Sequence, residues 1–303
     1  MVYFQLFSIS HPPIRTSFNM SDTVKKNAIG VMSGLSKDGS GLDIVSDFGL
    51  GCCQVVSWDM TLCKSDVAHA VRKRAADKGV RITALWAGVP GPANWNFSRG
   101  PVTLGLVPAE FRWARIEALK RWADFAVEMG APAIVTHCGF LPENMTDEGF
   151  EPLCVAIDQV ARHCDKLGIG FWFETGQETP VTLLRYIETV GLGNLGINLD
   201  PANLLMYGRG NPIDSLEVFG KYVRCIHAKD GRVPTNGNNL GPEVKVGEGM
   251  VRYPEFIRRL LDIGFAGDLI IEREISGDQQ KKDIAATVRY LESLLSAAVR
   301  PKE

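Results

Sequence analysis

Four short apolar stretches in the second half of the sequence each end on a residue type that binds hard divalent cations. The end residues are Glu174, Asp200, His227 and Glu272. Short apolar runs separated by helical stretches are typical of buried parallel strands, and an α/β barrel carries its chemistry at the carboxyl ends of its strands. Three carboxylates and one imidazole converging there would form a site rich in oxygen and nitrogen and free of thiolate. Such a site suits Mn, Mg, Co or Zn.

The joint pattern is more informative than any one of these residues. A single His at a strand end is more often a hydrogen-bonded core residue, and a single Glu there often forms a salt bridge. Four ionisable groups at corresponding positions of strands five to eight would repel or desolvate one another without a cation. We therefore expect a bound divalent metal. Glu274 lies on the same strand face as Glu272 and is the alternative ligand at that position.

Further polar and aromatic residues cluster near the same predicted strand ends. Aromatic rings beside a polar metal centre suit a sugar, which presents apolar C–H faces and polar edges, although tryptophans also pack under loops. A Lys or Arg in these loops could hold a phosphate or a hydroxyl group, or could form a surface ion pair with Asp230. The candidates for substrate binding are Trp86, His137, Gln177, Asn203, Lys229, Arg232 and Glu248.

The elements that must position these residues alternate regularly from about residue 27. Eight strands, each followed by a helix or a helix-sized segment, favour a single closed (β/α)8 TIM barrel over an open doubly wound sheet. No GxGxxG follows the first strand and no GxxxxGKS loop occurs, so a nucleotide-binding fold has little support. The predicted strands are 28–32, 53–57, 82–86, 133–137, 170–174, 195–200, 223–227 and 268–272. The predicted helices are 65–78, 111–129, 147–167, 180–190, 254–263 and 279–298, and most of them stop at a glycine.

One domain is expected, with the barrel at 27–303 and an N-terminal extension at 1–26. The start of the chain is apolar but lacks the basic region and the cleavage site of a signal peptide, and Met20 looks like a natural start. The stretch 88–108 is rich in Gly, Pro and Asn and contains Trp95. Because loops of that length tend to be functional or disordered, we expect it to lie over the barrel mouth.

Composition excludes several classes of partner. A net charge of −2 and a pI near 6.2 give no basic footprint for nucleic acid or an anionic membrane. The longest apolar runs fall well short of the roughly 18 residues that a spanning helix needs. Seven cysteines without a CxxC pair are ordinary for reduced, buried thiols in a cytosolic protein. We expect a cytoplasmic protein that acts on a small molecule.

Six motifs resemble those of the sugar phosphate isomerase/epimerase superfamily, the xylose-isomerase-like barrels related to endonuclease IV. They are THCGFLPEN (136–144), FETGQETP (173–180), NLDPAN (198–203), HAKD (227–230), VGEG (246–249) and IERE (271–274). The resemblance covers nearly all of the chain from about residue 27, and it implies a sugar substrate. Barrels of this family often pair, so a homo-oligomer is a further expectation.

The resemblance also implies roles for the four strand-end residues. In ketose 3-epimerases and inosose-processing members of the family, a Glu-Asp-His-Glu set holds one ion, and the matching positions are Glu174, Asp200, His227 and Glu272. Glu174 and Glu272 would face each other across the sugar and move the proton. The chemistry supports this, because a C–H group beside a carbonyl is too weakly acidic for an unaided carboxylate, and coordination to a metal makes the carboxylate an adequate base.

Departures from the family restrict the function. Endonuclease IV requires three metals, but Trp86, Asn203 and Val244 stand where further ligands would be needed, which disfavours a DNA nuclease and predicts a one-metal site. Asn203 also replaces a His of many ketose 3-epimerases, and Arg232 is only an approximate counterpart of their substrate-binding Arg. We therefore expect a metal-dependent sugar or sugar-phosphate isomerase or epimerase. A dehydratase or lyase on an inosose or 3-keto-sugar is the first alternative, and a non-catalytic sugar-binding subunit is the second.

Overall fold

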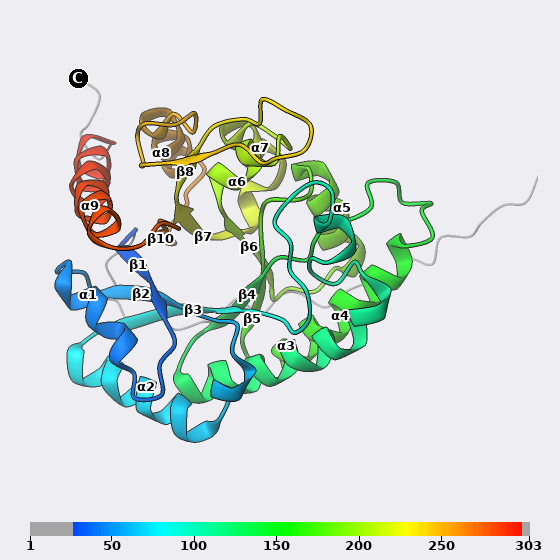
Figure 1. The fold of residues 1–303 in the computed structure, drawn as a ribbon, viewed down its shortest axis with the longest axis horizontal. Coiled ribbons are helices and arrows are strands. Elements are labelled where there is room, and N and C mark those ends of the chain that lie inside the picture. The colour runs from blue at the N-terminus through cyan, green and yellow to red at the C-terminus, as the bar shows by residue number, and fades with distance from the viewer. Residues whose placement is uncertain (1–26, 299–303) are drawn as a thin grey trace, which may run out of the picture.

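Eight parallel strands close into a barrel in the computed structural model, which describes residues 27–298. Going round the barrel, the strands follow the order β1, β10, β7, β6, β5, β4, β3, β2, and every neighbouring pair is parallel (Figure 1). The predicted (β/α)8 TIM barrel is therefore confirmed. The strands are β1 (Ile29–Gly34), β2 (Cys52–Ser57), β3 (Arg81–Ala87), β4 (Ala133–Thr136), β5 (Gly170–Glu174), β6 (Leu195–Leu199), β7 (Val223–Ala228) and β10 (Asp268–Ile271).

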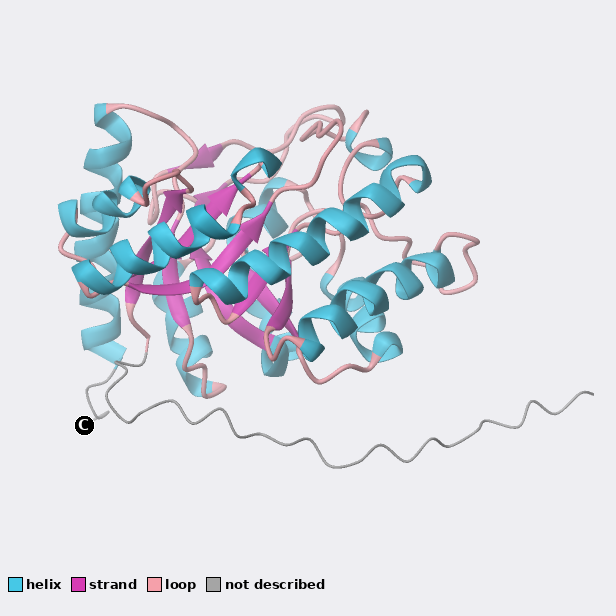
Figure 2. Cartoon of the chain, turned by 90° about the horizontal axis from the view of Figure 1, so that it is seen from below, coloured by secondary structure: helices cyan, strands magenta, loops and turns pink. Residues whose placement is uncertain are grey.

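Helices surround the strands on the outside (Figure 2). The longer ones are α2 (Ser65–Lys78), α3 (Ala109–Met129), α4 (Phe150–Lys166), α5 (Pro180–Val190), α7 (Pro212–Phe219), α8 (Tyr253–Asp262) and α9 (Asp278–Ala298). Short elements fill the connections: α1 (Asp43–Asp47), α6 (Pro201–Met206), a β8–β9 pair (Asp230–Gly231 with Glu243–Val244) and 3-10 turns at Ser40–Leu42, Met60–Leu62, Gly100–Val102 and Gly220–Tyr222. No helix among residues 27–298 is both long and apolar enough to cross a membrane.

The element boundaries follow from local chemistry. Gly130 and Gly191 adopt left-handed backbone conformations with φ of 88° and 66°, and they end α3 and α5 as the sequence predicts. The helix expected from residue 147 begins only at Phe150, because the Asp147 carboxylate accepts the Gly149 N–H in a turn that precedes it. The predicted N-terminal extension, residues 1–26, lies outside the described residues.

The barrel interior is filled rather than hollow, as barrel packing requires. Trp172 occupies much of it, with Gly170 on its own strand and Gly196 on the next, where an added Cβ would lie 2.3 and 2.6 Å from the indole ring. Polar side chains also lie in the interior, where the Gln54 Nε2 donates to the Asn198 Oδ1 at 3.1 Å. Both residues are fully buried.

The loop 88–108 is tied down by one buried arginine of α3. Arg115 donates from its guanidinium to the carbonyl oxygens of Pro90 (3.0 Å), Pro92 (2.9 Å) and Gly105 (2.6 Å). The loop thereby carries Trp95 to the cavity at the carboxyl ends of the strands. Its predicted place over the barrel mouth is confirmed.

Candidate metal and substrate site

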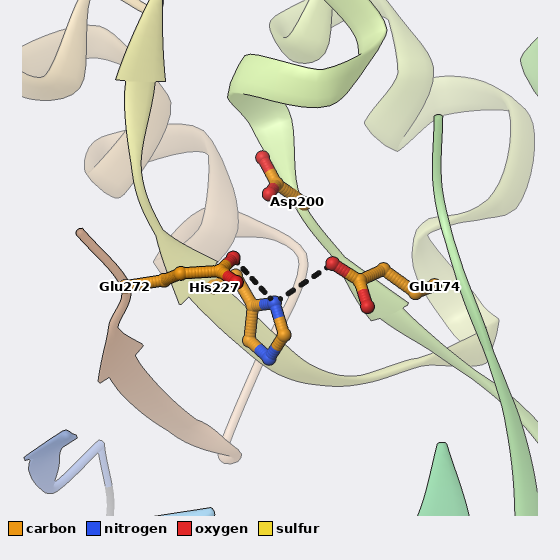
Figure 3. Close-up of side chains that lie close together, drawn as sticks. All are labelled: Glu174, Asp200, His227 and Glu272. Atoms are coloured by element: carbon orange, nitrogen blue, oxygen red, sulfur yellow. Dashed lines mark hydrogen bonds and ion pairs between the residues drawn. The ribbon is translucent and has the colours of Figure 1, made fainter. Parts of the chain in front are cut away.

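The four predicted ligands come together at the carboxyl ends of four strands. Glu174 is the last residue of β5 and His227 lies near the end of β7, whereas Asp200 and Glu272 come directly after β6 and β10. One ligand atom from each lies within 4.8 Å of every other, and the four side chains point toward one another (Figure 3). Asp200 is held in place because its Oδ1 also caps α6 by accepting the Asn203 N–H at 2.9 Å.

His227 is oriented by a neighbour on each side of its ring. Its Nε2 lies 2.8 Å from the Gln54 Oε1, an atom that can only accept, so Nε2 carries the hydrogen. Its Nδ1 lies 3.0 Å from the Glu174 Oε1 and 3.1 Å from the Glu272 Oε2 (Figure 3). Burial disfavours a charged imidazole, but the Glu174 and Glu272 carboxylates outweigh it and raise the pKa of His227 well above its usual value. Nδ1 is the nitrogen presented to the carboxylates.

The carboxylates of the cluster are distinct from one another in their surroundings. Burial raises the pKa of Asp200 to about 8. Burial also acts on Glu272, but the positive charges of Lys229 and His227 prevail and lower its pKa. In the same way, His137 and His227 lower the pKa of Glu174 against its burial. Carboxyl groups whose pKa values are shifted in opposite directions within one pocket are often found at functional sites.

The residues present fit one divalent ion. Asp200 Oδ2 is a buried oxygen without a hydrogen-bond partner among the described residues, and the Lys229 ammonium lies 3.6 Å from it. Glu272 Oε2 faces the His227 Nδ1 at 3.1 Å and the Lys229 ammonium at 3.6 Å. Buried charged oxygens without partners are costly. Together with Glu174 and His227 they form a hard donor set of oxygen and nitrogen, which suits Mg, Mn, Co or Zn.

Lys229 is a buried cation behind the cluster and not a surface residue. Its ammonium group lies 2.6 Å from the Glu274 Oε1 and 3.6 Å from both Asp200 and Glu272. The alternative ion pair with Asp230 is wrong, because the Asp230 carboxylate instead accepts the backbone N–H groups of Gly231, Gly247, Gly249 and Val251. An added Cβ at Gly249 would lie 2.0 Å from the Asp230 Oδ1, which explains the glycine of the VGEG motif.

The geometry distinguishes Glu272 from Glu274. Glu272 belongs to the group of converging ligand atoms, whereas the Glu274 side chain is 56% exposed at the rim of the cavity and pairs with Lys229. The backbone of Glu274 is also held away from the metal cluster, since its N–H donates to the Glu243 carboxylate. Of the two, Glu272 has the position of a ligand.

Three of the predicted substrate residues contact the Glu174 carboxylate. The Trp86 indole N–H donates to the Glu174 Oε2, and the His137 Nε2 lies 3.5 Å from the same oxygen. Burial lowers the pKa of His137, so its ring is neutral near pH 7. Asn203 donates to the Thr175 carbonyl at 3.2 Å, with the Glu174 Oε1 at 3.5 Å. Glu174 is therefore held on both oxygens.

A cavity of about 300 Å³ opens directly above this cluster. Trp86, His137 and Asn203 line it, and their part in substrate binding stays a prediction. Gln177 is buried and has neither amide atom paired within the described part of the chain. Arg232 and Glu248 are not among the lining residues. Arg232 donates to the Glu248 carbonyl at 2.8 Å, and the Glu248 carboxylate pairs with Lys245. Their predicted part in substrate binding stays a prediction.

Several site residues were not found from the sequence. Gln54 had a visible signal, an amide in the middle of the apolar strand CCQVVS, because such a residue needs a buried partner. Tyr207 and Leu240 line the cavity from connections after β6 and β8, and no pattern in their neighbourhood points to that position.

The fold and the site define a class: a (β/α)8 barrel with a hard-metal donor set and a small cavity at the carboxyl ends of its strands. Residues 42–294 match the model of the xylose isomerase-like TIM barrel family. The chain belongs to that family.

Individual relatives agree with this assignment. The xylose isomerase domain protein from Planctomyces limnophilus is 36% identical, with a TM-score of 0.84 over 89% of this chain and 98% of that one. A D-tagatose 3-epimerase-like protein has a TM-score of 0.70 at 19% identity, over 89% of this chain and 98% of that one, so it shows the fold alone. An uncharacterised protein of Methanocaldococcus jannaschii is 26% identical over 202 residues, which span 62% of this chain and 66% of that protein.

Proposed function

We propose that the chain is a divalent-metal-dependent sugar isomerase or epimerase in which a carboxylate moves a proton beside a metal-bound carbonyl. The observation that carries the proposal is the position of the Glu174, Asp200, His227 and Glu272 ligand atoms, all within 4.8 Å of one another, at the floor of a cavity of about 300 Å³. The family supports a sugar substrate, and the donor set supports one Mn, Mg, Co or Zn ion.

Each residue of the site has a task in this reaction. Glu174, Asp200, His227 and Glu272 would hold the ion, whose positive charge polarises a substrate carbonyl and acidifies the adjacent C–H group. Glu272 lines the cavity and its side chain is 17% exposed, so its carboxylate can reach a substrate proton. Trp86 and His137 keep Glu174 in place, and they are themselves packed against Trp58 and Trp95.

Solvent deuterium exchange tests the proposal. After removal of metals, the protein is incubated in D₂O with Mn, Mg, Co or Zn and a panel of ketoses and keto-sugars, and the products are analysed by mass spectrometry. We expect metal-dependent incorporation of deuterium, reduced about 10²–10⁴-fold in Glu272→Gln, because general-base catalysis contributes that much. The exposed Glu148→Gln variant is the control and should exchange normally. Absence of exchange across the panel would contradict the proposal.

A dehydratase or lyase is the second candidate, and one observation favours it. Epimerisation at one carbon needs an acid and a base on opposite faces of the substrate, but both oxygens of Glu174 are already engaged by Trp86 and His227. Only one oxygen of Glu272, Oε2, is engaged by His227 and Lys229. Glu272 alone could remove the proton and pass it to the β-hydroxyl, which would then leave as water. Formation of an enone chromophore from an inosose or 3-keto-sugar would select this reaction. The non-catalytic alternative predicts instead that Glu272→Gln alters no measurable activity.

The proposal includes a cytoplasmic location. It is supported by the seven cysteines, all of them free and six of them buried, since reduced thiols are typical of a reducing compartment. Secretion of the native protein into an oxidising compartment would contradict it. A homo-oligomer stays an expectation from the family.

A further inference from the structure

The cavity above the metal cluster has one aromatic wall. Trp58 and Trp86 lie with ring centroids 4.9 Å apart, and Trp95 meets Trp58 edge-on at 6.0 Å. Trp58 is 44% exposed and Trp95 is 39% exposed, although burial of a tryptophan side chain is strongly favourable. This wall is ready to cover the apolar C–H face of a ring.

Neutral polar groups also line the cavity, and the ring of one of them, His137, lies 5.1 Å from that of Trp95. His137 Nδ1 and Tyr207 OH are buried atoms without a hydrogen-bond partner among residues 27–298, and both residues line the cavity. Buried polar atoms are almost always paired, so these two are available to a ligand. A hydroxyl group can satisfy both kinds of atom, because it donates to one and accepts from the other.

The charged residues of the cavity wall are all acidic. Glu174, Glu272 and Glu274 line it, and no Lys or Arg lines it among the described residues. The nearest ammonium group, that of Lys229, is 2% exposed and already surrounded by Glu274, Glu272 and Asp200. An anion entering the cavity would therefore meet carboxylates and no cation free of an acidic partner among the described residues.

We propose that the site selects an uncharged monosaccharide or cyclic polyol ketone and discriminates against its phosphorylated and carboxylated derivatives. This inference rests on the proposed function, from which it takes that the substrate is a sugar, and it adds the charge and the size of that substrate. A cavity of about 300 Å³ lies at the small end of ligand pockets and accommodates a single ring. A phosphate would meet a negative field without an Arg or Lys to bind it.

Glu274 has a specific part in this discrimination. Its carboxylate stands at the rim, where an incoming anion passes, and it also occupies the Lys229 ammonium at 2.6 Å. Removing its charge with Glu274→Gln weakens the repulsion and frees a Lys229 donor. The variant should therefore tolerate a phosphate better than the parent protein does.

Equilibrium binding tests the proposal without relying on turnover. Binding of D-fructose, D-tagatose, an inosose and the phosphate of each is measured by quenching of tryptophan fluorescence in the Mg²⁺-loaded protein, since Trp58, Trp86 and Trp95 line the cavity. We expect each neutral compound that binds to do so at least tenfold more tightly than its phosphate. Glu274→Gln should narrow this ratio at least threefold, while Glu148→Gln, an exposed carboxylate remote in the sequence from the site, should leave it unchanged.

Specific results would overturn the proposal. They are a phosphate that binds as tightly as its parent sugar, a panel in which no neutral member binds, or an unchanged ratio in Glu274→Gln. Deuterium exchange, measured in parallel, separates this proposal from the proposed function. Deuterium exchange into phosphorylated sugars alone would overturn the proposed preference for uncharged substrates and would leave the proposed reaction intact. Selective binding of neutral sugars without exchange or elimination would support the preference and contradict the proposed reaction.

Discussion

At the scale of single residues, Gln54 decides which nitrogen of His227 faces the carboxylates. Its Oε1 accepts from the His227 Nε2 at 2.8 Å, and its Nε2 donates to the Asn198 Oδ1 at 3.1 Å. Partners of this kind orient ligating imidazoles, and their loss typically lowers metal affinity 10–100-fold. We therefore assign Gln54 a positioning role.

Gln54→Leu should lower the affinity for Mn²⁺ by about 10–100-fold, measured by calorimetry or by electron paramagnetic resonance of free Mn²⁺. Gln54→Glu keeps an acceptor for the His227 Nε2–H and should restore most of the affinity. Asn198→Leu is the matched control, because it removes the other partner of the amide and leaves the imidazole bond intact. Equal losses of affinity in Gln54→Leu and Asn198→Leu would show that the effect is general disruption of the barrel interior.

Glu178, in the connection between β5 and α5, makes a pH-dependent contribution to stability. It is 3% exposed, and burial raises its pKa to about 8, although backbone N–H groups and Arg209 act in the opposite direction. Between about pH 4.5 and pH 8 the folded protein therefore holds a proton that the unfolded chain releases. This contribution to stability is fully present below pH 4.5 and is lost as the pH rises through 8.

Glu178→Gln should remove this contribution to the pH dependence. We expect the free energy of unfolding of the variant to exceed that of the parent protein by several kcal/mol at pH 8, on the order of 4 kcal/mol from the size of the shift, and the difference to shrink toward pH 5. Denaturant titrations at both pH values measure it. Glu148→Gln should keep the pH dependence of the free energy of unfolding of the parent protein. If the free energy of unfolding of Glu178→Gln changed with pH in parallel with that of the parent protein, Glu178 would not be the source of the pH dependence.

At the scale of elements, α3 and the loop 88–108 act together through Arg115. The guanidinium is 1% exposed and donates to three loop carbonyls, two of which belong to the segment leading to Trp95. Arg115→Met should lower the free energy of unfolding by about 3 kcal/mol, as loss of a buried hydrogen-bond network does. It should also raise the KM for the sugar, because Trp95 loses its support.

Arg112→Met provides the comparison on the same helix. Arg112 donates to the carbonyls of Leu106 and Val107 at the far end of the loop, away from Trp95. We expect its effect to be on stability with little change in KM, whereas Arg115→Met changes both and increases hydrogen exchange in 88–108. Indistinguishable KM values for the two variants would show that Arg115 does not support the cavity wall.

The elements also show what the sequence could predict. Strand ends such as Glu174 and Asp200 were visible because a polar residue closing an apolar run has a fixed place in a parallel barrel. The segment between β6 and β7 was predicted only as helix-sized, and it contains two helices, α6 and α7, that each begin with a proline. The β8–β9 pair and the inward direction of Leu240 depend on contacts between distant loops, which single-sequence periodicity does not encode.

At the scale of the whole molecule, the metal site joins half of the closed sheet. Its ligands come from β5, β6, β7 and β10, which are consecutive neighbours around the barrel. In the absence of an ion, buried carboxylates at this junction repel one another and are only partly compensated by Lys229. Because the unfolded chain does not bring these residues together, an ion bound at the proposed site would stabilise the folded barrel.

Metal removal should therefore lower the melting temperature of the entire barrel and not only its activity. At a free Mg²⁺ or Mn²⁺ concentration of about 100 times the Kd, the stabilisation is about 2.7 kcal/mol, which corresponds to roughly 4–5 °C for a chain of this size. Calorimetric scans before and after chelation measure the shift. Glu272→Gln should melt at the same temperature with and without metal, whereas Glu148→Gln should retain the full shift. A shift that persists in Glu272→Gln would place the stabilising ion elsewhere, and the four-strand junction would then lose its assignment as the metal site.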